Sequence, residues 1–175
     1  MQDTLPIHFA PLQGYTEAIY RNAHDAFFGG VDTYYTPFVR LEKGNFRRRD
    51  VRGIEPENNG VTHLIPQLIA SSAEKAEVIL SLFIEKGYQE VDINLGCPFP
   101  LLAKRHNGSG ILPYPEEVKA LLSIVTRYPQ ISFSVKMRLG WEQPDECLAL
   151  APILNDLPLR QITMHPRLGK QGYTG

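Results

Sequence analysis

The stretch SSAEKAEVILSLFIEKGYQEVDINLG (residues 71–96) holds one complete helix and the strand that follows it. Ser71 or Ser72 suits the helix N-cap, apolar residues then recur at spacings of three and four, and Gly87 ends the pattern. The apolar run EVDINLG that comes next predicts a strand. A helix followed closely by a strand is the repeating unit of parallel α/β proteins, so this stretch predicts the fold class.

The same alternation extends along the whole chain. Strands are predicted to start near residues 7, 31, 62, 90, 131 and 161, and helices are predicted over residues 16–28, 71–87, 115–128 and 145–157. The polar connection over residues 41–61 predicts a loop. One strand about every thirty residues is the spacing of βαβ units, whose strands are parallel and whose crossovers are right-handed.

Two architectures fit this pattern, a doubly wound open sheet and a (β/α)8 barrel. The doubly wound sheet needs a glycine-rich turn after its first strand, but APLQGYT (residues 10–16) has one glycine and no G-x-G-x-x-G. We therefore expect an α/β fold of the (β/α)8 TIM-barrel type. Since a full barrel takes about 250 residues, we expect this one to be truncated after about six βα units.

Composition narrows the class of protein. The chain has 175 residues, 43% of them hydrophobic, and a net charge of -1, which predicts one folded domain without a global attraction to nucleic acid or membrane. Two cysteines do not make a disulfide framework and fit a reducing compartment. Residues 1–12 lack a signal-peptide pattern, and no apolar run approaches the roughly 18 residues of a membrane span, so we expect a cytoplasmic protein.

Polar side chains interrupt four successive strands near their carboxyl ends. They are Gln67, Asn94 with Cys97, Lys136 with Arg138, and His165 with Arg167. A buried parallel strand is usually apolar throughout, and a polar group there costs free energy unless it is paired. Because strand ends of parallel α/β proteins carry the active site, one shared polar ligand explains all four interruptions.

Each of these residues also has an ordinary structural interpretation. A lone free cysteine is more often a buried packing residue than a reactive one, Lys136 suits a strand-end lysine that reaches solvent, and His165 suits a satisfied core histidine. Asp92 and Asn94 lie on the same face of their strand, so one can brace the other. The functional interpretation depends on the set rather than on any single member.

Other motifs are absent or ambiguous. The five histidines and two cysteines show no metal-ligand spacing, so no metal is expected, and no nucleophile elbow or P-loop occurs. FRRRDVR (residues 46–52) is typical of a solvated loop but is also suited to phosphate contacts. AKRHNGSG (residues 103–110) suggests a mobile loop that touches an anion.

The motifs APLQGYT, PQLIAS, DINLGCP, KRHNGSGIL, SVKMRLGW and HPRLGKQGYTG together resemble the tRNA-dihydrouridine synthases in order and spacing, from Ala10 to Gly175. The resemblance implies a flavoprotein oxidoreductase with an FMN-binding TIM-barrel domain and a C-terminal helical domain that binds tRNA. Such enzymes reduce particular uridines in tRNA to dihydrouridine and use NADPH to reduce the flavin. One departure is His165-Pro166-Arg167-Leu168, where the family usually has His-Gly-Arg-Thr.

The resemblance also implies roles for individual residues. Cys97 matches the general acid that protonates C5 of uracil. Gln67, Lys136 and His165 match flavin ligands, and Pro11 and Leu12 match backbone neighbours of the isoalloxazine. Asn94 matches a contact to flavin or uracil, while Arg138 and Tyr173 match residues that line the uracil pocket.

On this interpretation residues 1–175 are a partial TIM-barrel catalytic domain, and the C-terminal barrel strands and the helical tRNA-binding domain are absent. We expect the isolated chain to retain FMN weakly and to have little or no activity. Two alternatives stay open: an FMN barrel oxidoreductase acting on a free pyrimidine, such as a dihydroorotate or dihydropyrimidine dehydrogenase, and a non-catalytic RNA-binding fragment. The modified tRNA position, the choice between NADPH and NADH and the oligomeric state do not follow from the sequence.

Overall fold

The computed structural model describes residues 5–174. Residues 1–4 and Gly175 lie outside the described residues. The first group belongs to the segment that was searched for a signal peptide, and Gly175 ends the last motif. The first elements are β1 (His8–Phe9), α1 (Ala18–Phe27), β2 (Thr33–Tyr35), β3 (Leu41–Glu42), β4 (Asn45–Phe46), α2 (Arg48–Ile54), the 3-10 helix η1 (Pro56–Asn58), β5 (Leu64–Ile65) and β6 (Gln67–Leu68). They are followed by α3 (Ala73–Glu85), β7 (Glu90–Leu95), α4 (Pro100–Ala103), the 3-10 helix η2 (Gly108–Ile111), α5 (Pro115–Leu122), α6 (Ile124–Arg127), β8 (Ser132–Gly140), α7 (Glu146–Asn155) and β9 (Gln161–Leu168).

The parallel strands pair in the order in which they occur along the chain. β1 pairs with β2 and β2 with β5, while β6, β7, β8 and β9 form a second parallel ladder in that order. Only Pro66 separates β5 from β6, and its missing N–H interrupts the ladder. A doubly wound sheet reverses its strand order at a switch point, whereas this order never reverses. The barrel-type α/β prediction is therefore confirmed.

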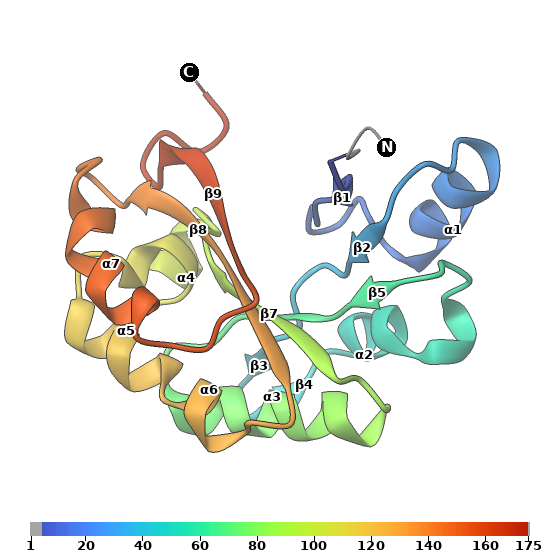
Figure 1. Cartoon of the computed structure of the whole chain (residues 1–175), viewed down its shortest axis with the longest axis horizontal. Coiled ribbons are helices and arrows are strands. Elements are labelled where there is room, and N and C mark those ends of the chain that lie inside the picture. The colour runs from blue at the N-terminus through green and yellow to red at the C-terminus, as the bar shows by residue number, and fades with distance from the viewer. Residues whose placement is uncertain (1–4, 175) are drawn as a thin grey trace.

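The sheet curves into an open arc with helices along its outer side (Figure 1). β1, β2 and β5 form one side of the arc, β7, β8 and β9 form the other, and the edge strands β1 and β9 stand apart. α3 and α5 to α7 lie outside the second side. No helix of residues 5–174 has the length and apolarity that a bilayer span requires.

The predicted loop over residues 41–61 is wrong, because it contains two short strands and a helix. β3 and β4 form an antiparallel hairpin whose turn residues Lys43 and Gly44 both have positive φ, 50° and 80°. That backbone matches the twist of a two-residue hairpin, but the usual Asn-Gly or Asp-Gly signal is missing. α2 then buries Asp50, which accepts hydrogen bonds from Arg47 Nε at 2.8 Å and Nη2 at 2.7 Å. The helix was not predicted because its run of arginines is typical of a solvated loop.

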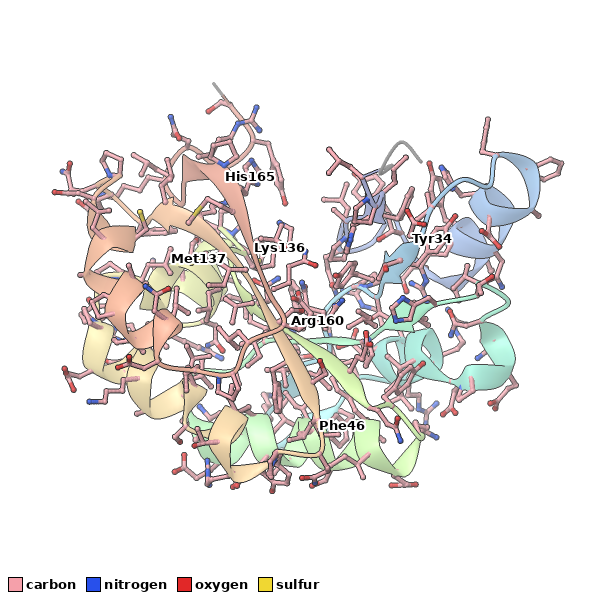
Figure 2. The ribbon with its side chains drawn as sticks, viewed as in Figure 1. Tyr34, Phe46, Lys136, Met137, Arg160 and His165 are labelled. Atoms are coloured by element: carbon pink, nitrogen blue, oxygen red, sulfur yellow. The ribbon has the colours of Figure 1, made fainter. Side chains whose placement is uncertain are left out.

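Alternation along β8 separates the apolar core from the interior of the arc. Phe133, Val135 and Met137 are fully buried in the main hydrophobic cluster, which also contains residues of α3, α5 and α7. Lys136 lies on the other face of the strand, as Figure 2 shows beside Met137. Because alternate residues of a strand point to opposite faces, every polar strand residue with this phase points into the arc.

The buried aromatic ring of β8 makes a sharp test of this packing. We predict that Phe133→Ala lowers the free energy of unfolding by about 3–5 kcal/mol, because it leaves a cavity between the sheet and the helices. Phe27→Ala, at a position 83% exposed, is the matched control and is expected to change it by less than about 0.5 kcal/mol. Urea unfolding followed by circular dichroism measures both, and equal effects would contradict the assignment of the core face.

Candidate active site

All nine residues to which the resemblance gives a role line one cavity at the carboxyl ends of the strands, whereas Arg167, which was grouped with them as a strand-end polar residue, does not line it. The cavity has a volume of about 270 Å³ and contains Pro11, Leu12, Gln67, Asn94, Cys97, Lys136, Arg138, His165 and Tyr173. They come from six separate segments, and the parallel register brings them together: Asn94 pairs with Lys136, and Arg138 with His165. Gln13 and Phe38 also line it and were missed, although Gln13 stands in the loop directly after the first strand.

A chain of hydrogen bonds runs from the interior of the arc to the turn that carries Cys97. Ser134 Oγ donates to Asp92 Oδ1 at 2.6 Å, and Gln67 Nε2 donates to Asp92 Oδ2 at 2.6 Å. Asn94 Nδ2 donates to Gln67 Oε1 at 2.7 Å. Asn94 Oδ1 then accepts from the backbone N–H groups of residues 96 and 97, at 2.9 and 2.8 Å. Asp92 and Asn94 share a face as expected, but Gln67 bridges them.

The carboxylate at the base of this chain sets its direction. Asp92 accepts a hydrogen bond from Gln67 Nε2, so Gln67 turns its NH₂ group toward Asp92 and its oxygen toward Asn94. Asn94 must then turn its own NH₂ group toward Gln67, which leaves its oxygen facing the turn. Burial raises the pKa of Asp92, while the hydrogen bonds from Ser134 and Gln67 lower it and favour the charged form.

Cys97 is half-buried at the start of the turn, with its thiol in the cavity. Burial raises the pKa of the Cys97 thiol, and the Phe99 backbone N–H and the charges of Arg138 and Arg40 offset part of that rise. The thiol is therefore held in its protonated form at neutral pH. A protonated thiol beside a cavity is chemically suited to proton donation rather than to nucleophilic attack.

The end of the AKRHNGSG stretch (residues 103–110), which was predicted to be a mobile loop that touches an anion, clamps the backbone of Cys97. Ser109 donates to the Cys97 carbonyl from its backbone N at 3.0 Å and from its Oγ at 2.9 Å, and its side chain is fully buried. Gly108 has a φ of 59°, and a Cβ there would lie 2.6 Å from the Cys97 carbonyl oxygen. Only glycine fits so close an approach, which explains the NGSG sequence.

Arg138 joins two loops at the mouth of the cavity. Its Nε donates to the carbonyl of Gly96 at 2.9 Å, and its Nη1 donates to the carbonyls of Leu168 and Gly172, each at 2.8 Å. The guanidinium carbon lies 5.8 Å from the centre of the Tyr173 ring. Arg138 was predicted to line a uracil pocket, and it does line the cavity, but these donors hold the backbone in place.

Lys136 and His165 are two further titratable groups that line the cavity. Burial lowers the pKa of Lys136, partly offset by the charge of Asp92. Among residues 5–174 no carboxylate lies within ion-pair distance of the Lys136 ammonium group. Burial and the positive charges of Arg138 and Lys136 lower the pKa of His165, so its imidazole is neutral at neutral pH.

The Leu12 backbone is used within its own loop. Its N–H donates to Thr16 Oγ1 at 2.9 Å, and its carbonyl accepts from the N–H groups of Tyr15 and Thr16 at 3.0 Å. The predicted contact of Pro11 and Leu12 with the isoalloxazine ring of a flavin therefore depends on packing rather than on hydrogen bonds from the Leu12 backbone. No cluster of three or more metal-ligating side chains occurs in the described part of the chain.

A parallel βα arc with Gln, Lys, His and a protonated thiol around one strand-end cavity defines an enzyme domain of the TIM-barrel class. The chain belongs to the dihydrouridine synthase family, whose model, described as Dihydrouridine synthase (Dus), matches residues 8–175. It is 29% identical over 173 residues to "Probable tRNA-dihydrouridine synthase 1" of Synechocystis sp., covering 95% of this chain and 46% of that protein. It is 28% identical over 177 residues to "tRNA-dihydrouridine(16) synthase" of Haemophilus ducreyi, covering 95% and 54%. The chain thus spans about half the length of these curated relatives.

The state of the thiol can be measured directly. In the Cys147→Ser variant, which leaves one thiol in the chain, we predict that the rate of Cys97 alkylation by iodoacetamide rises with a midpoint above the ordinary thiol pKa of about 8.5. The reason is that burial disfavours the thiolate. Mass spectrometry of the modified peptide at successive pH values gives the profile. A midpoint at or below about 8.5 would show that the neighbouring positive charges outweigh burial.

Proposed function

We propose that the protein reduces specific uridines of tRNA to 5,6-dihydrouridine, with FMN as its cofactor and NADPH as the reductant. The observation that carries this proposal is the single cavity in which Cys97, Gln67, Lys136 and His165 meet. Membership of the dihydrouridine synthase family supports it. Because the chain spans about half of its relatives, we further propose that residues 1–175 are part of a TIM-barrel catalytic domain, with the remaining strands and a helical tRNA-binding domain in a longer protein.

The donor set of the cavity fits an isoalloxazine. The pyrimidine edge of that ring offers carbonyl acceptors and an N–H donor, and it accumulates negative charge when reduced. Lys136 provides an ammonium group that has no carboxylate within ion-pair distance in the described part of the chain, and Gln67 provides an amide of fixed orientation. The neutral imidazole of His165 and the loop of Pro11 and Leu12 complete this set. When bound, FMN supplies hydride-transfer chemistry.

In this proposal Cys97 supplies the proton that complements hydride addition. Its Sγ–H donates to C5 of the uracil ring, and the raised pKa keeps that proton available at neutral pH. The thiolate that remains lies near the Phe99 N–H and the positive charges of Arg138 and Arg40, which stabilise it until solvent reprotonates it. The hydrogen-bond chain from Asp92 through Asn94 holds the Cys97 turn still during the transfer.

The substrate has to present its base outside the stack. Uracil within a folded tRNA reaches an enclosed thiol only when it is flipped out of its helix, and a strand-end cavity suits a flipped base. Asn94 keeps one N–H and Arg138 keeps its Nη2 group for contacts there, beyond the bonds that they already make. A tRNA substrate would place the reaction in the cytoplasm.

The acid role is tested by removing the thiol. We predict that, in the longer protein that contains this chain, Cys97→Ala lowers the rate of dihydrouridine formation in tRNA by about 10²–10⁴-fold, since the proton donor is lost. Cys147→Ala, which removes the other cysteine, is the control and should leave the rate unchanged. Mass spectrometry of nucleosides from treated tRNA measures the product. Unchanged formation by the Cys97 variant would refute the role, and reduction of free uracil or orotate without reduction of tRNA would favour a free-pyrimidine enzyme.

The cofactor assignment has its own readout. We predict that Lys136→Met lowers the amount of FMN retained after purification severalfold, because the ammonium group that faces the ring is lost. Flavin absorbance per protein measures retention, and Lys119→Met on the exposed face of α5 is the control for the lost charge. Equal retention by both variants would remove Lys136 from the flavin site.

A further inference from the structure

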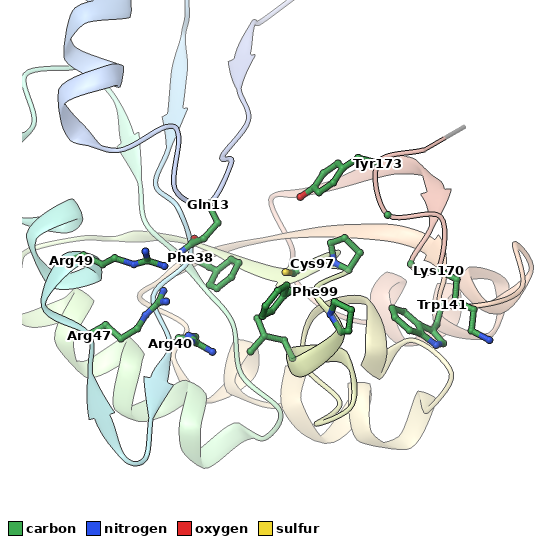
Figure 3. A pocket seen from close by; sticks show the side chains of 15 residues that line it. Gln13, Phe38, Arg40, Arg47, Arg49, Cys97, Phe99, Trp141, Lys170 and Tyr173 are labelled. Atoms are coloured by element: carbon green, nitrogen blue, oxygen red, sulfur yellow. The ribbon is translucent and has the colours of Figure 1, made fainter.

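A second and larger cavity of about 780 Å³ adjoins the first on the side of β3, β4 and α2. Gln13, Phe38, Cys97 and Tyr173 line both cavities, so a ligand that reaches from one to the other passes the thiol. Figure 3 shows Cys97 near the centre of this cavity, the arginines on one side and Trp141 on the other. Of the residues that line this cavity but not the first, only Arg40 and the Phe99 backbone have a role in the function proposed above.

Unpaired polar atoms belong to two residues that line this second cavity. Among residues 5–174, four buried side-chain nitrogen and oxygen atoms have no hydrogen-bond partner. Three of them belong to these two residues: the oxygen and the nitrogen of the amide of Gln13, which lines both cavities, and Nε of Arg40, which lines the second cavity alone. Buried polar groups are normally paired, so such a concentration indicates that a ligand with both a donor and an acceptor completes the site.

Positive charge exceeds negative charge on the wall formed by the hairpin and α2. Arg40, Arg47 and Arg49 all line the cavity, and Arg47 and Arg49 share one buried carboxylate, that of Asp50, at 2.7 and 3.7 Å. Among residues 5–174 the one ion pair of Arg40 is with Glu42 at the surface, at 3.3 Å. The Arg49 side chain is 52% exposed and free to turn toward an anion. Arginine is suited to phosphate because its planar N–H groups match phosphate oxygens.

The opposite wall is aromatic. Phe99 is 52% exposed, and Trp141 stands beside Lys170, whose charge is paired with Glu142 at 2.6 Å. Rings that face a cationic wall across a cavity provide stacking surface for a base together with charge for its phosphate. This combination distinguishes a nucleotide from a free inorganic anion as the fitting ligand.

We propose that this second cavity is a nucleotide-phosphate subsite, in which Arg40 and Arg49 hold a phosphate group and Gln13 hydrogen-bonds a base edge beside Cys97. The inference rests on the proposed function and extends it by one named site. The same phosphate chemistry is offered by the phosphodiester next to the target uridine in RNA and by the phosphates of a nicotinamide dinucleotide. The cavity thus serves whichever of these two partners is positioned at the thiol.

The only tryptophan of the chain, Trp141, reports on occupancy of this cavity. Titration of the purified protein with 5′-UMP and with uridine, followed by Trp141 fluorescence, compares ligands that differ only in the phosphate. We expect UMP to bind at least about fivefold more tightly than uridine, because charge-assisted hydrogen bonds to phosphate are strong. Arg49→Gln should abolish most of this preference. Arg48→Gln, which removes the same charge from the exposed neighbouring residue outside the cavity, should retain it.

Equal losses in the two variants, or no phosphate preference in the wild-type protein, would overturn the site. Repeating the titrations with a short uridine-containing single-stranded RNA and with NADPH identifies the source of the phosphate. A loss for either ligand in Arg49→Gln but not in Arg48→Gln supports the site and names its occupant, and no selective loss for either overturns it. Dihydrouridine formation is measured in parallel. Its absence in the longer wild-type protein that contains this chain refutes the proposed function, whereas its persistence at full rate in the Arg49→Gln variant of that longer protein refutes only the subsite.

Discussion

The buried carboxylate of Asp92, which accepts two hydrogen bonds, orients the reactive end of this protein. It receives hydrogen bonds from Gln67 and Ser134, each at 2.6 Å, on strands to either side of its own. Through Gln67 and Asn94 that polarity reaches the backbone of the Cys97 turn. In a buried, low-dielectric setting a fully satisfied chain of this kind is rigid, and a half-satisfied one is costly. The position of the thiol therefore depends on Asp92, although Asp92 does not contact the turn itself. The contact is made by Asn94, two residues further along the same strand.

Parallel pairing in chain order is what makes this chain of contacts possible. Each strand places its alternate residues in the interior of the arc, and the ladder sets Gln67 opposite Asp92 and Asn94 opposite Lys136. The other phase of the same strands supplies Leu68, Ile93 and Val135 to the apolar core. The residues that stabilise the fold and the residues that line the cavity thus lie on opposite faces of one sheet. A substitution on one face therefore does not directly remove contacts on the other.

The strand-and-helix pattern and the polar strand ends were predictable because each leaves a local signal. Gln67, Lys136 and His165 interrupt runs that are otherwise apolar, and such interruptions are costly unless they have a partner. The hairpin over residues 41–46 and α2 were not predictable, because Lys43-Gly44 is a weak turn signal and a run of arginines hides the buried Asp50 and Ile54. The clamp role of Ser109 was missed because its partner, the Cys97 carbonyl, is twelve residues away.

What the sequence by itself determined is the alternation of elements, the apolar and polar phases of each strand, and the resemblance that points to the dihydrouridine synthases. These follow from neighbours along the chain, where periodicity and turn chemistry act. The tertiary structure decided which polar groups are already paired, as with the Arg138 guanidinium, and which described atoms are left unpaired, as with the Gln13 amide and Nε of Arg40. Pairing depends on polar atoms that come from distant segments of the chain. The distances between these atoms are fixed only when the strands have paired in their final register.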